Sequence, residues 1–366
     1  MRDTPNPPSN GRRRICFVLE TAHQAFTGER MIGGAETQIR TVGECLVERG
    51  HGVWVASARP FEHPTIGSLT TDRLWSGLRA LRPDLVVATV AMRRTVEAAV
   101  VSRLLGLEFV YRVASTEESR YRITKPSGGD PLSRLALYLM LHHLTARIWC
   151  QHDEQQRNFE HRRLGHKAFV AFNLVPDRRV PGIRDGARDT DPRAPDPRDT
   201  VLWVGRFDVI KGPDLFLDLA RRLTERRCLM ICPGVTDAFR AAAATLDHVE
   251  ILDYVPPEEL APHYARARVL VNTSSREGSP NTFIEAACQG TPVVTAGLDP
   301  GGFFARFGFG RAAEGIDAMV DAVEALFDDP EHFTDLSTRA RRYFEEVHDL
   351  DRQFPRLERQ LLGAEA

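Results

Sequence analysis

The segment SSREGSPNTFIEAACQGTPVV, residues 274–294, places two carboxylates on either side of a turn. Seven residues separate Glu277 from Glu285, among them Pro280 and Asn281. A carboxylate can accept hydrogen bonds from two neighbouring hydroxyl groups at once, so a ribose or another sugar is a natural ligand for each glutamate. The alternative is that Glu285 simply starts a helix, where the N-terminal dipole favours a negative charge.

Two cations precede this segment, in VGRFDVIKGPDLFLDLA, residues 204–220. Arg206 follows a strand that is predicted to end at Gly205, and Lys211 stands just before a Gly-Pro helix start. The guanidinium fork of an arginine and the point charge of a lysine can together neutralise a diphosphate. The alternative is that both side chains are solvated and that the Gly-Pro pair only ends a loop.

A third feature is the sequence GGAET, residues 33–37, where Gly33 and Gly34 open a predicted helix after the first strand. Glycines allow a phosphate or a sugar to approach the backbone, and the N–H groups of a helix start favour negative charge. The spacing is not GxGxxG, so it does not predict a dinucleotide site. An ordinary turn is the alternative. Together, a glycine turn, two cations and two carboxylates match a nucleotide-diphosphate sugar, which has hydroxyls at both ends and a diphosphate between them.

The elements that must position these residues are short apolar strands that alternate with helical patterns. Continuous apolar strands of this kind indicate parallel sheets covered on both faces, and the alternation restarts after residue 200. The sequence therefore predicts two doubly wound α/β domains, with the ligand between them at the carboxyl ends of the strands. The predicted strands are 15–20, 53–57, 84–90, 108–113, 147–151, 168–172, 201–205, 228–234, 249–255, 268–274 and 291–297.

Changes in composition along the chain suggest the domain boundaries. Residues 177–200 are rich in Pro, Asp and Arg and predict a linker. The predicted organisation is a disordered lead-in (1–14), an acceptor domain (15–176), the linker (177–200), a donor domain (201–345) and a C-terminal helix (346–366) that could pack back on the first domain.

The composition excludes several other classes of protein. The chain of 366 residues has 27% charged residues and a formal net charge of -2, which argues against binding nucleic acid through bulk charge. The six cysteines are isolated in apolar patterns, so we expect buried free thiols and a reducing compartment. No stretch is long and apolar enough to span a bilayer, and residues 1–14 do not resemble a secretory signal, so we expect a cytoplasmic protein.

Over about 100 residues, the Gly-Arg…Lys-Gly loop, the Glu-x7-Glu segment, the Gly-Thr-Pro-Val-Val strand and a following Gly-Gly resemble the retaining glycosyltransferases of glycosyltransferase family 4. The Gly-Gly-Ala-Glu turn supports the same resemblance more weakly. The resemblance implies the GT-B fold, in which two Rossmann-like domains face a central cleft. It also implies transfer of a sugar from a nucleotide-diphosphate donor, such as a UDP-sugar, to a hydroxyl group with retention of configuration.

The resemblance further implies roles for individual residues. Arg206 and Lys211 would bind the diphosphate and stabilise the leaving group, Glu285 would hold the ribose, and Glu277 would contact the transferred sugar. No metal or cofactor is implied, because cationic side chains and a helix N-terminus replace the cation. The implied catalytic residues are Arg206, Lys211 and Glu277, and the implied donor-binding residues are Gly33, Gly34, Gly205, Arg206, Lys211, Tyr254, Val255, Glu277, Gly278, Ser279, Pro280, Asn281, Thr282, Phe283 and Glu285.

One position departs from the family pattern. Many members carry a histidine after the strand that corresponds to 108–113, whereas this chain reads Ala-Ser-Thr-Glu-Glu at 114–118. Ser115, Thr116 or Glu117 could take over the contact, and His152 is predicted to start a helix. Three alternatives to a transferase stay open. A nucleotide-sugar epimerase and a phosphorylase could share the two-domain plan, and the missing histidine suggests a non-catalytic nucleotide-sugar binding subunit.

The acceptor and the oligomeric state have no signature in the sequence. The resemblance is compatible with a glycan, lipid-linked or small-molecule acceptor, and with polysaccharide biosynthesis. The apolar segment PLSRLALYLMLHHLTARIW, residues 131–149, allows a lipid-facing helix at the inner membrane face. A buried crossover helix is the favoured interpretation of that segment.

Overall fold

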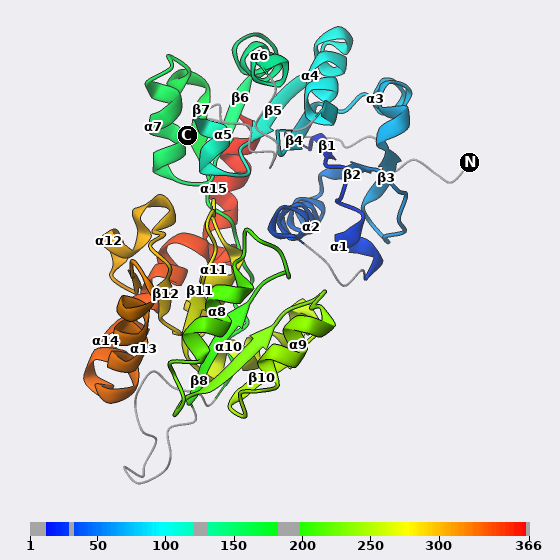
Figure 1. Cartoon of the computed structure of the whole chain (residues 1–366). Coiled ribbons are helices and arrows are strands. Elements are labelled where there is room, and N and C mark those ends of the chain that lie inside the picture. The colour runs from blue at the N-terminus through cyan, green and yellow to red at the C-terminus, as the bar shows by residue number, and fades with distance from the viewer. Residues whose placement is uncertain (1–11, 29–32, 92, 121–130, 182–197, 364–366) are drawn as a thin grey trace. The chain divides into compact units, whose positions relative to one another are not determined.

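The computed structural model describes residues 12–28, 33–91, 93–120, 131–181 and 198–363 (Figure 1). The chain divides into two compact units. The N-terminal unit comprises the residues up to 174 together with 353–366, and the C-terminal unit comprises 175–352. Residues 1–11 of the predicted lead-in and 182–197 of the predicted linker lie outside the described residues.

The N-terminal unit contains a seven-stranded parallel sheet in the order β3-β2-β1-β4-β5-β6-β7. All five residues of β4 are buried, as expected for a strand covered on both faces. The strands are β1 Arg14–Val18, β2 Gly52–Ser57, β3 Gly67–Thr70, β4 Leu85–Thr89, β5 Glu108–Arg112, β6 Arg147–Cys150 and β7 Ala168–Val170. The helices are α1 Gln24–Thr27, α2 Gly34–Glu48, α3 Leu74–Leu81, α4 Arg93–Leu105, α5 Thr116–Ser119, α6 Pro131–Leu139 and α7 Asp153–Glu160.

The C-terminal unit contains a six-stranded parallel sheet in the order β10-β9-β8-β11-β12-β13. Its central strand β11 is buried along its whole length. The strands are β8 Thr200–Val204, β9 Arg227–Ile231, β10 Val249–Leu252, β11 Ala267–Asn272, β12 Val293–Thr295 and β13 Gly310–Ala312. The helices are α8 Pro213–Ala220, α9 Asp237–Ala243, α10 Ala261–Arg266, α11 Asn281–Cys288, α12 Phe303–Phe307, α13 Ile316–Asp328 and α14 Pro330–Tyr343.

Each sheet has a point where the direction of strand addition reverses. In the N-terminal sheet this point lies between β1 and β4, and in the C-terminal sheet it lies between β8 and β11. Loops that leave the carboxyl ends of two such strands diverge to opposite faces of the sheet and leave room for a ligand. The prediction of doubly wound parallel sheets is thus confirmed.

Two strands were not predicted, and both lie at sheet edges. Every residue of β3 is only partly buried, and β13 consists of three residues, of which Arg311 and Ala312 are exposed. Edge strands are covered on fewer sides than central ones, so they lack the continuous apolar run on which the sequence prediction depended.

The last helix, α15 (Leu350–Leu362), supplies residues to both units because the division falls at residue 353. Phe354, Leu357 and Leu361 are buried. Within the N-terminal unit the Nε2 atom of His51 lies 3.0 Å from a carboxylate oxygen of Glu358. From Gln353 onward the final helix therefore belongs to the N-terminal unit.

The segment 131–149 differs from its favoured interpretation. It forms α6, a π-helical segment (Met140–Leu144) and then β6. Leu137 is buried, but Leu132 and Leu135 are exposed. The prediction of a buried crossover helix is therefore wrong for α6, because one face of this helix is exposed.

The cysteines largely follow the prediction. All six are free thiols, and all are buried except Cys45, which is partly exposed. Within the described ranges, every helix falls short of the length and apolar character that a bilayer span requires.

Candidate functional site

The loop after β8 carries both predicted cations at the switch point of the C-terminal sheet. The backbone N–H of Gly205 donates to the carbonyl of Ile231 on β9, which fixes the start of this loop. The Arg206 side chain is 49% exposed, and its guanidinium lies 3.6 Å from the carboxylate of Asp208. Arg206 therefore keeps most of its donors available to a ligand.

A close backbone contact joins this loop to the end of β11. Gly212 has a φ of +64°, and a Cβ atom there would lie 2.6 Å from the carbonyl oxygen of Thr273. The Thr273 hydroxyl lies 2.8 Å from the Lys211 carbonyl oxygen and 2.7 Å from that of Gly212. The Ser275 N–H donates to the Ile210 carbonyl. Glycine is required at 212 because only it combines this φ with this approach.

This contact brings Lys211 and Glu277 together. The Lys211 ammonium donates to a carboxylate oxygen of Glu277 over 2.7 Å, and the Asn272 side-chain amide lies 3.4 Å from the same oxygen. Glu277 is 9% exposed at its side chain and Lys211 is 25% exposed. The sequence placed these two residues at different parts of one ligand, whereas the structure pairs them directly.

The turn from Gly278 to Asn281 leads into α11. Gly278 is buried, and Ser279, Pro280, Asn281 and Thr282 are partly buried. The N–H of Phe283 donates to the carbonyl of Pro280, and the helix begins at Asn281. The helix therefore begins four residues after Glu277 in the chain.

Glu285 lies in the second turn of α11, so its interpretation as the residue that starts the helix is wrong. It is partly buried, and the Tyr264 hydroxyl of α10 donates to it over 2.8 Å. Burial raises the pKa of Glu285 to about 7, against the opposing effects of the Tyr264 hydrogen bond and the Arg178 charge. Near neutral pH this carboxyl therefore exists in both protonation states.

Tyr264 is a residue of this site that the sequence did not reveal. It is fully buried in α10, and its backbone carbonyl accepts a bond from the Thr291 hydroxyl. The segment LAPHYARA that contains Tyr264 reads as an ordinary helix, and Glu285 lies 21 positions further along the chain. Only the packing of α10 against α11 brings the two side chains together.

Tyr254 and Val255 lie at the same carboxyl edge but further along it. They are partly buried in the loop after β10, which is two strands away from β8. They follow the end of the edge strand β10, whereas the Lys211–Glu277 pair lies after the central strands β8 and β11.

Gly33 and Gly34 form the start of α2 in the N-terminal unit, as predicted. Gly33 is the N-cap residue, and its carbonyl accepts a bond from the Thr37 N–H. A Cβ atom on Gly33 would lie 2.3 Å from the Oε2 atom of Glu36. The other carboxylate oxygen of Glu36, Oε1, accepts a bond from the Thr21 hydroxyl. This nearby carboxylate makes the turn better suited to a hydroxyl group than to a phosphate.

The segment after β5 forms a closed polar cluster. Glu118 is buried and accepts bonds from the Tyr111 hydroxyl (2.6 Å) and from the N–H groups of Ala114 (2.9 Å) and Ala91 (3.3 Å). Burial raises the pKa of Glu118, and these hydrogen bonds oppose that shift. At the end of β5 itself, the buried Arg112 guanidinium donates to the Asn173 side chain.

His152 lies beside this cluster. It is the N-cap residue of α7, as predicted, although its side chain caps no N–H. Its Nε2 atom lies 3.2 Å from the hydroxyl of Thr116. Burial lowers the pKa of His152 to about 4, so the imidazole is neutral at physiological pH.

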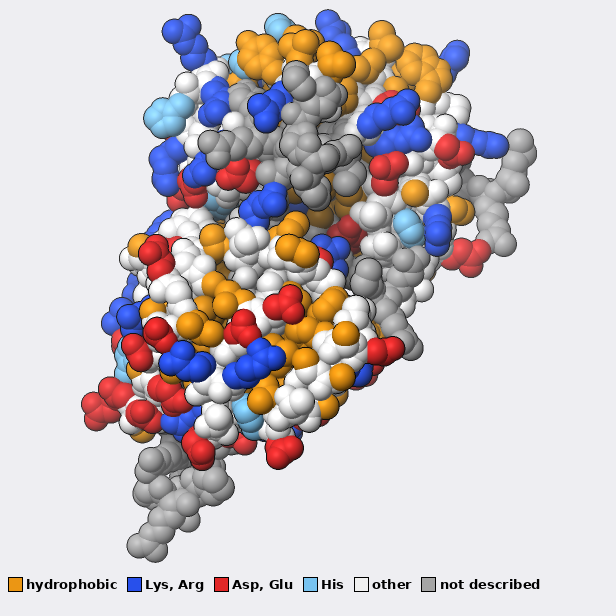
Figure 2. Space-filling model, viewed as in Figure 1, with side chains coloured by type: hydrophobic (Ala, Val, Ile, Leu, Met, Phe, Trp, Pro, Cys, Tyr) orange, Lys and Arg blue, Asp and Glu red, His pale blue; other side chains and the backbone are white. Residues whose placement is uncertain are grey.

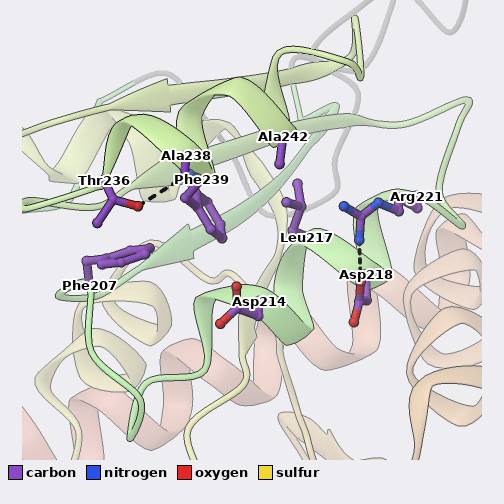
Figure 3. A pocket seen from close by; sticks show the side chains of 9 residues that line it. All are labelled: Phe207, Asp214, Leu217, Asp218, Arg221, Thr236, Ala238, Phe239 and Ala242. Atoms are coloured by element: carbon purple, nitrogen blue, oxygen red, sulfur yellow. Dashed lines mark hydrogen bonds and ion pairs between the residues drawn. The ribbon is translucent and has the colours of Figure 1, made fainter.

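A cavity of about 330 Å³ lies between α8 and α9 (Figure 3). The rings of Phe207 and Phe239 meet edge to face at 5.1 Å on one side, and the Asp218–Arg221 ion pair lies on the other. None of the predicted donor-binding residues lines it. Among the described residues, no three His, Cys, Asp or Glu side chains gather where they could hold a metal ion.

Comparisons with known proteins agree with the resemblance that the sequence motifs in the C-terminal unit suggested. A family model described as glycosyl transferases group 1 matches residues 198–329. A D-inositol 3-phosphate glycosyltransferase from Rhodococcus opacus is 30% identical over 184 residues, which are 45% of this chain and 41% of that protein. The chain spans less than half the length of the curated relatives that it matches.

Solved structures show the fold of the whole chain. Sucrose-phosphate synthase from Thermosynechococcus elongatus has a TM-score of 0.76 at 17% identity and covers 97% of this chain and 100% of its own. Anabaena Alr3699/HepE in complex with UDP and glucose has a TM-score of 0.73 at 13% identity, with coverage of 96% and 100%. The fold is therefore GT-B, and the resemblance to group 1 glycosyltransferases is confirmed for residues 198–329.

Proposed function

We propose that this chain, whose residues 198–329 belong to the glycosyl transferases group 1, transfers a sugar from a nucleotide-diphosphate donor to a hydroxyl group with retention of configuration. One observation carries the proposal. Lys211 pairs with Glu277 at the β8–β11 switch point, within the matched region, and the loop that carries Lys211 also carries the half-exposed Arg206. A switch point of this kind is where a parallel sheet binds its ligand.

The two cations serve the diphosphate in this proposal. An ammonium group has three donors, so Lys211 can keep its bond to Glu277 and offer the others to phosphate oxygens. Arg206 is half exposed and adds a planar fork with two parallel donors. Together with the N-terminus of α11 they stabilise the charge that grows on the leaving group.

The two glutamates serve the hydroxyl groups. Glu277 is held by Lys211 and Asn272, which leaves its second oxygen for the sugar being transferred. Glu285 accepts from the ribose hydroxyls while Tyr264 holds one of its oxygens. The ionised form of Glu285 binds the ribose more strongly, because only a carboxylate accepts at both oxygens.

The reaction breaks the bond between the anomeric carbon and the diphosphate oxygen, and forms a bond from that carbon to the acceptor oxygen on the same face. The acceptor proton passes to the departing diphosphate. In this proposal the chemistry requires neither a metal nor a cofactor, because the chain's own cations neutralise the diphosphate.

The names of the relatives guide the choice of substrates. One solved relative is described in complex with UDP and glucose, and a curated relative is named for D-inositol 3-phosphate. We therefore propose a UDP-sugar as donor and a hydroxyl acceptor on a glycan, a lipid-linked sugar or a small molecule. The proposed place of action is the cytoplasm, with peripheral contact at the inner membrane face.

Product analysis tests this function. The purified chain is incubated with UDP-, GDP- and ADP-sugars and a panel of hydroxyl acceptors, and the anomeric configuration of the product is read by NMR. We expect a glycoside of retained configuration, and its loss in Glu285→Ala. The matched control is Arg222→Ala, which removes a charge from an exposed ion pair with Asp317 in the same unit.

The other outcomes identify the alternatives. Free nucleoside diphosphate with an isomerised sugar and no need of acceptor would indicate an epimerase. Release of a sugar phosphate that depends on added phosphate would indicate a phosphorylase. Donor binding without any turnover would indicate a binding subunit, and full transfer by Glu285→Ala would contradict the assignment of the ribose site.

A further inference from the structure

The cavity between α8 and α9 is separate from the residues proposed to bind the donor. Its volume of about 330 Å³ lies near the lower end of the range of about 300–1,000 Å³ that is usual for small-molecule sites. Figure 2 shows hydrophobic side chains exposed among charged ones on the face of the C-terminal unit that carries α8 and α9. The cavity therefore has room for a small ligand.

The inner wall of this cavity is apolar and aromatic. Leu217 of α8 and Phe239 of α9 are buried, and Phe207 is partly buried. The rings of Phe207 and Phe239 meet edge to face with their centroids 5.1 Å apart. Such a wall attracts the hydrocarbon part of a ligand, and the face of a phenylalanine ring also attracts a cation within about 6 Å of its centre.

The rim of the cavity is negatively charged. Its charged lining residues are Asp214, Asp218 and Arg221, all of them exposed. Two aspartates and one arginine leave a net charge of -1. Arg221 is bound by Asp218, whereas the Asp214 side chain has no hydrogen-bond or ion-pair partner among the described residues. In the view of Figure 3, Asp214 lies between the two phenylalanines and the Asp218–Arg221 pair. The unneutralised charge of the rim is therefore that of Asp214.

This combination of groups selects among classes of ligand. A carboxylate beside aromatic rings favours an ammonium group, which can form a charge-assisted hydrogen bond and contact a ring face at once. An anion is disfavoured, because the one cation among the described lining residues, Arg221, is already paired. A neutral sugar needs several polar partners. The described lining residues offer it one neutral polar side chain, Thr236, whose oxygen accepts the Phe239 N–H.

We propose that the cavity between α8 and α9 binds a small organic cation, with its ammonium group against the Asp214 carboxylate and its apolar part against Phe207 and Phe239. Phe207 directly follows Arg206, and Asp214 comes three residues after Lys211. A bound cation therefore contacts both sides of the loop that carries the two cationic side chains. It occupies none of the predicted donor-binding residues, since none of them lines the cavity. The binding needs neither donor nor acceptor, so it goes beyond the proposed transferase function.

Three probes of similar size and different charge test the proposal with the full chain. At pH 7 the ligand 2-phenylethylamine is a cation, 2-phenylethanol is neutral and phenylacetate is an anion. Ligand-observed NMR titrations measure their affinities. We expect a dissociation constant on the order of 1 mM for the amine, binding of the alcohol that is about three- to fivefold weaker, and weaker binding still of phenylacetate. Saturating UDP should leave the affinity for the amine within about twofold of its value without UDP.

Two variants locate the amine in the cavity. Asp214→Asn should lower the affinity for the amine by about three- to fivefold and leave that for the alcohol unchanged, because only the amine loses an ionic partner. Ala238→Trp adds a large side chain at an exposed lining position and should abolish binding of both probes. Asp237→Asn is the matched control. It removes an exposed carboxylate from the first turn of α9, outside the cavity lining, and should change the affinity for the amine by less than about twofold.

Four results would overturn the proposal. They are no binding of the amine at about 10 mM, equal binding of the alcohol, an unchanged affinity in Asp214→Asn, and displacement of the amine by UDP. Equal binding of the alcohol would indicate a neutral ligand, and displacement by UDP would place the amine at the donor site. Thermal unfolding of each variant checks that the fold persists. If UDP itself fails to bind, the transferase proposal fails while binding of the amine still stands.

Discussion

Both sheets carry Arg and Glu side chains at their carboxyl edges, but those of the C-terminal unit include exposed cations and those of the N-terminal unit are buried. In the C-terminal unit the Arg206 side chain is 49% exposed and Lys211 25% exposed, while in the N-terminal unit Arg112 and Glu118 are 3% and 7% exposed. Glu118 is already satisfied by a hydroxyl and two backbone N–H groups. Charged residues at a sheet edge therefore indicate a ligand site only where the fold leaves their hydrogen-bonding capacity unused.

Lys211→Ala should have the largest effect, because it removes a charge from the open edge. We expect turnover to fall by about 100- to 1,000-fold, as for loss of one group that stabilises a developing negative charge. Steady-state kinetics with the preferred donor measures this. The turnover of the control Arg222→Ala should stay close to that of the wild type. Normal turnover of Lys211→Ala would contradict the view that the exposed charges of the C-terminal sheet edge bind the ligand.

Glu118→Ala should act on stability instead. It leaves the Tyr111 hydroxyl and two backbone N–H groups without their buried acceptor, so we expect a loss of about 3 kcal/mol in the free energy of unfolding. Denaturant unfolding measures the loss. Nucleoside diphosphate affinity at low temperature should change little.

Glu117→Ala is the matched control for that substitution. Glu117 lies next in the chain and pairs with Arg120 at the surface over 3.3 Å. Its removal should cost less than about 1 kcal/mol. If the two substitutions cost the same, the closed cluster after β5 does not stabilise the N-terminal unit.

Glu285→Gln should stabilise the chain above neutral pH. The pKa of Glu285 is raised from 4.5 to about 7 in the folded state, so its ionisation opposes folding. Its penalty is absent below pH 4.5, develops as the pH rises, and is complete above about 7. The neutral amide should therefore add on the order of 1–3 kcal/mol at pH 8 and nothing at pH 4.

Chemical denaturation at both pH values measures this difference. Glu259→Gln, at an exposed position of the same unit, is the control and should show no gain at pH 8. An equal gain at pH 4 and pH 8 for Glu285→Gln would mean that packing rather than charge is responsible. The more stable Glu285→Gln variant should bind the donor more weakly, because residues that bind a ligand often reduce the stability of the protein.

Tyr264→Phe should produce the smallest effect. The Tyr264 hydrogen bond lowers the pKa of Glu285, so its loss should raise that pKa further. The pH midpoint of nucleoside diphosphate binding should move upward by about one unit or less. Calorimetric titrations between pH 5.5 and 8.5, which bracket a midpoint of about 7, measure the shift. The control is Tyr343→Phe, at the end of α14, because Tyr343 is buried like Tyr264. A downward shift would contradict the role of the hydroxyl.

Much of the fold could be predicted from the sequence because central strands are buried on both faces and are mostly apolar. The edge strands β3 and β13 escaped because they are short and half exposed. The outer face of α6 was misjudged for a related reason: Leu132 and Leu135 look the same in sequence whether they face a core or the surface.

In the candidate site, too, local features could be predicted and tertiary contacts could not. Arg206, Lys211 and Glu277 could be placed near one another from the sequence because each lies in a loop that follows a strand at the switch point. The pairing of Lys211 with Glu277 and the contact of Tyr264 with Glu285 could not, since they depend on packing between segments 66 and 21 residues apart. The shifted pKa of Glu285 is a property of that packing and has no local signal.

The last helix has a consequence for how the protein is made. Because residues 353–366 complete the N-terminal unit, the ribosome must synthesise the entire C-terminal unit before the first unit can close. Until then the surface that Phe354, Leu357 and Leu361 cover stays open, which is the kind of exposure that recruits chaperones. A fragment ending at residue 174 would keep that surface open permanently, so an isolated N-terminal unit should be produced with the final helix fused to it.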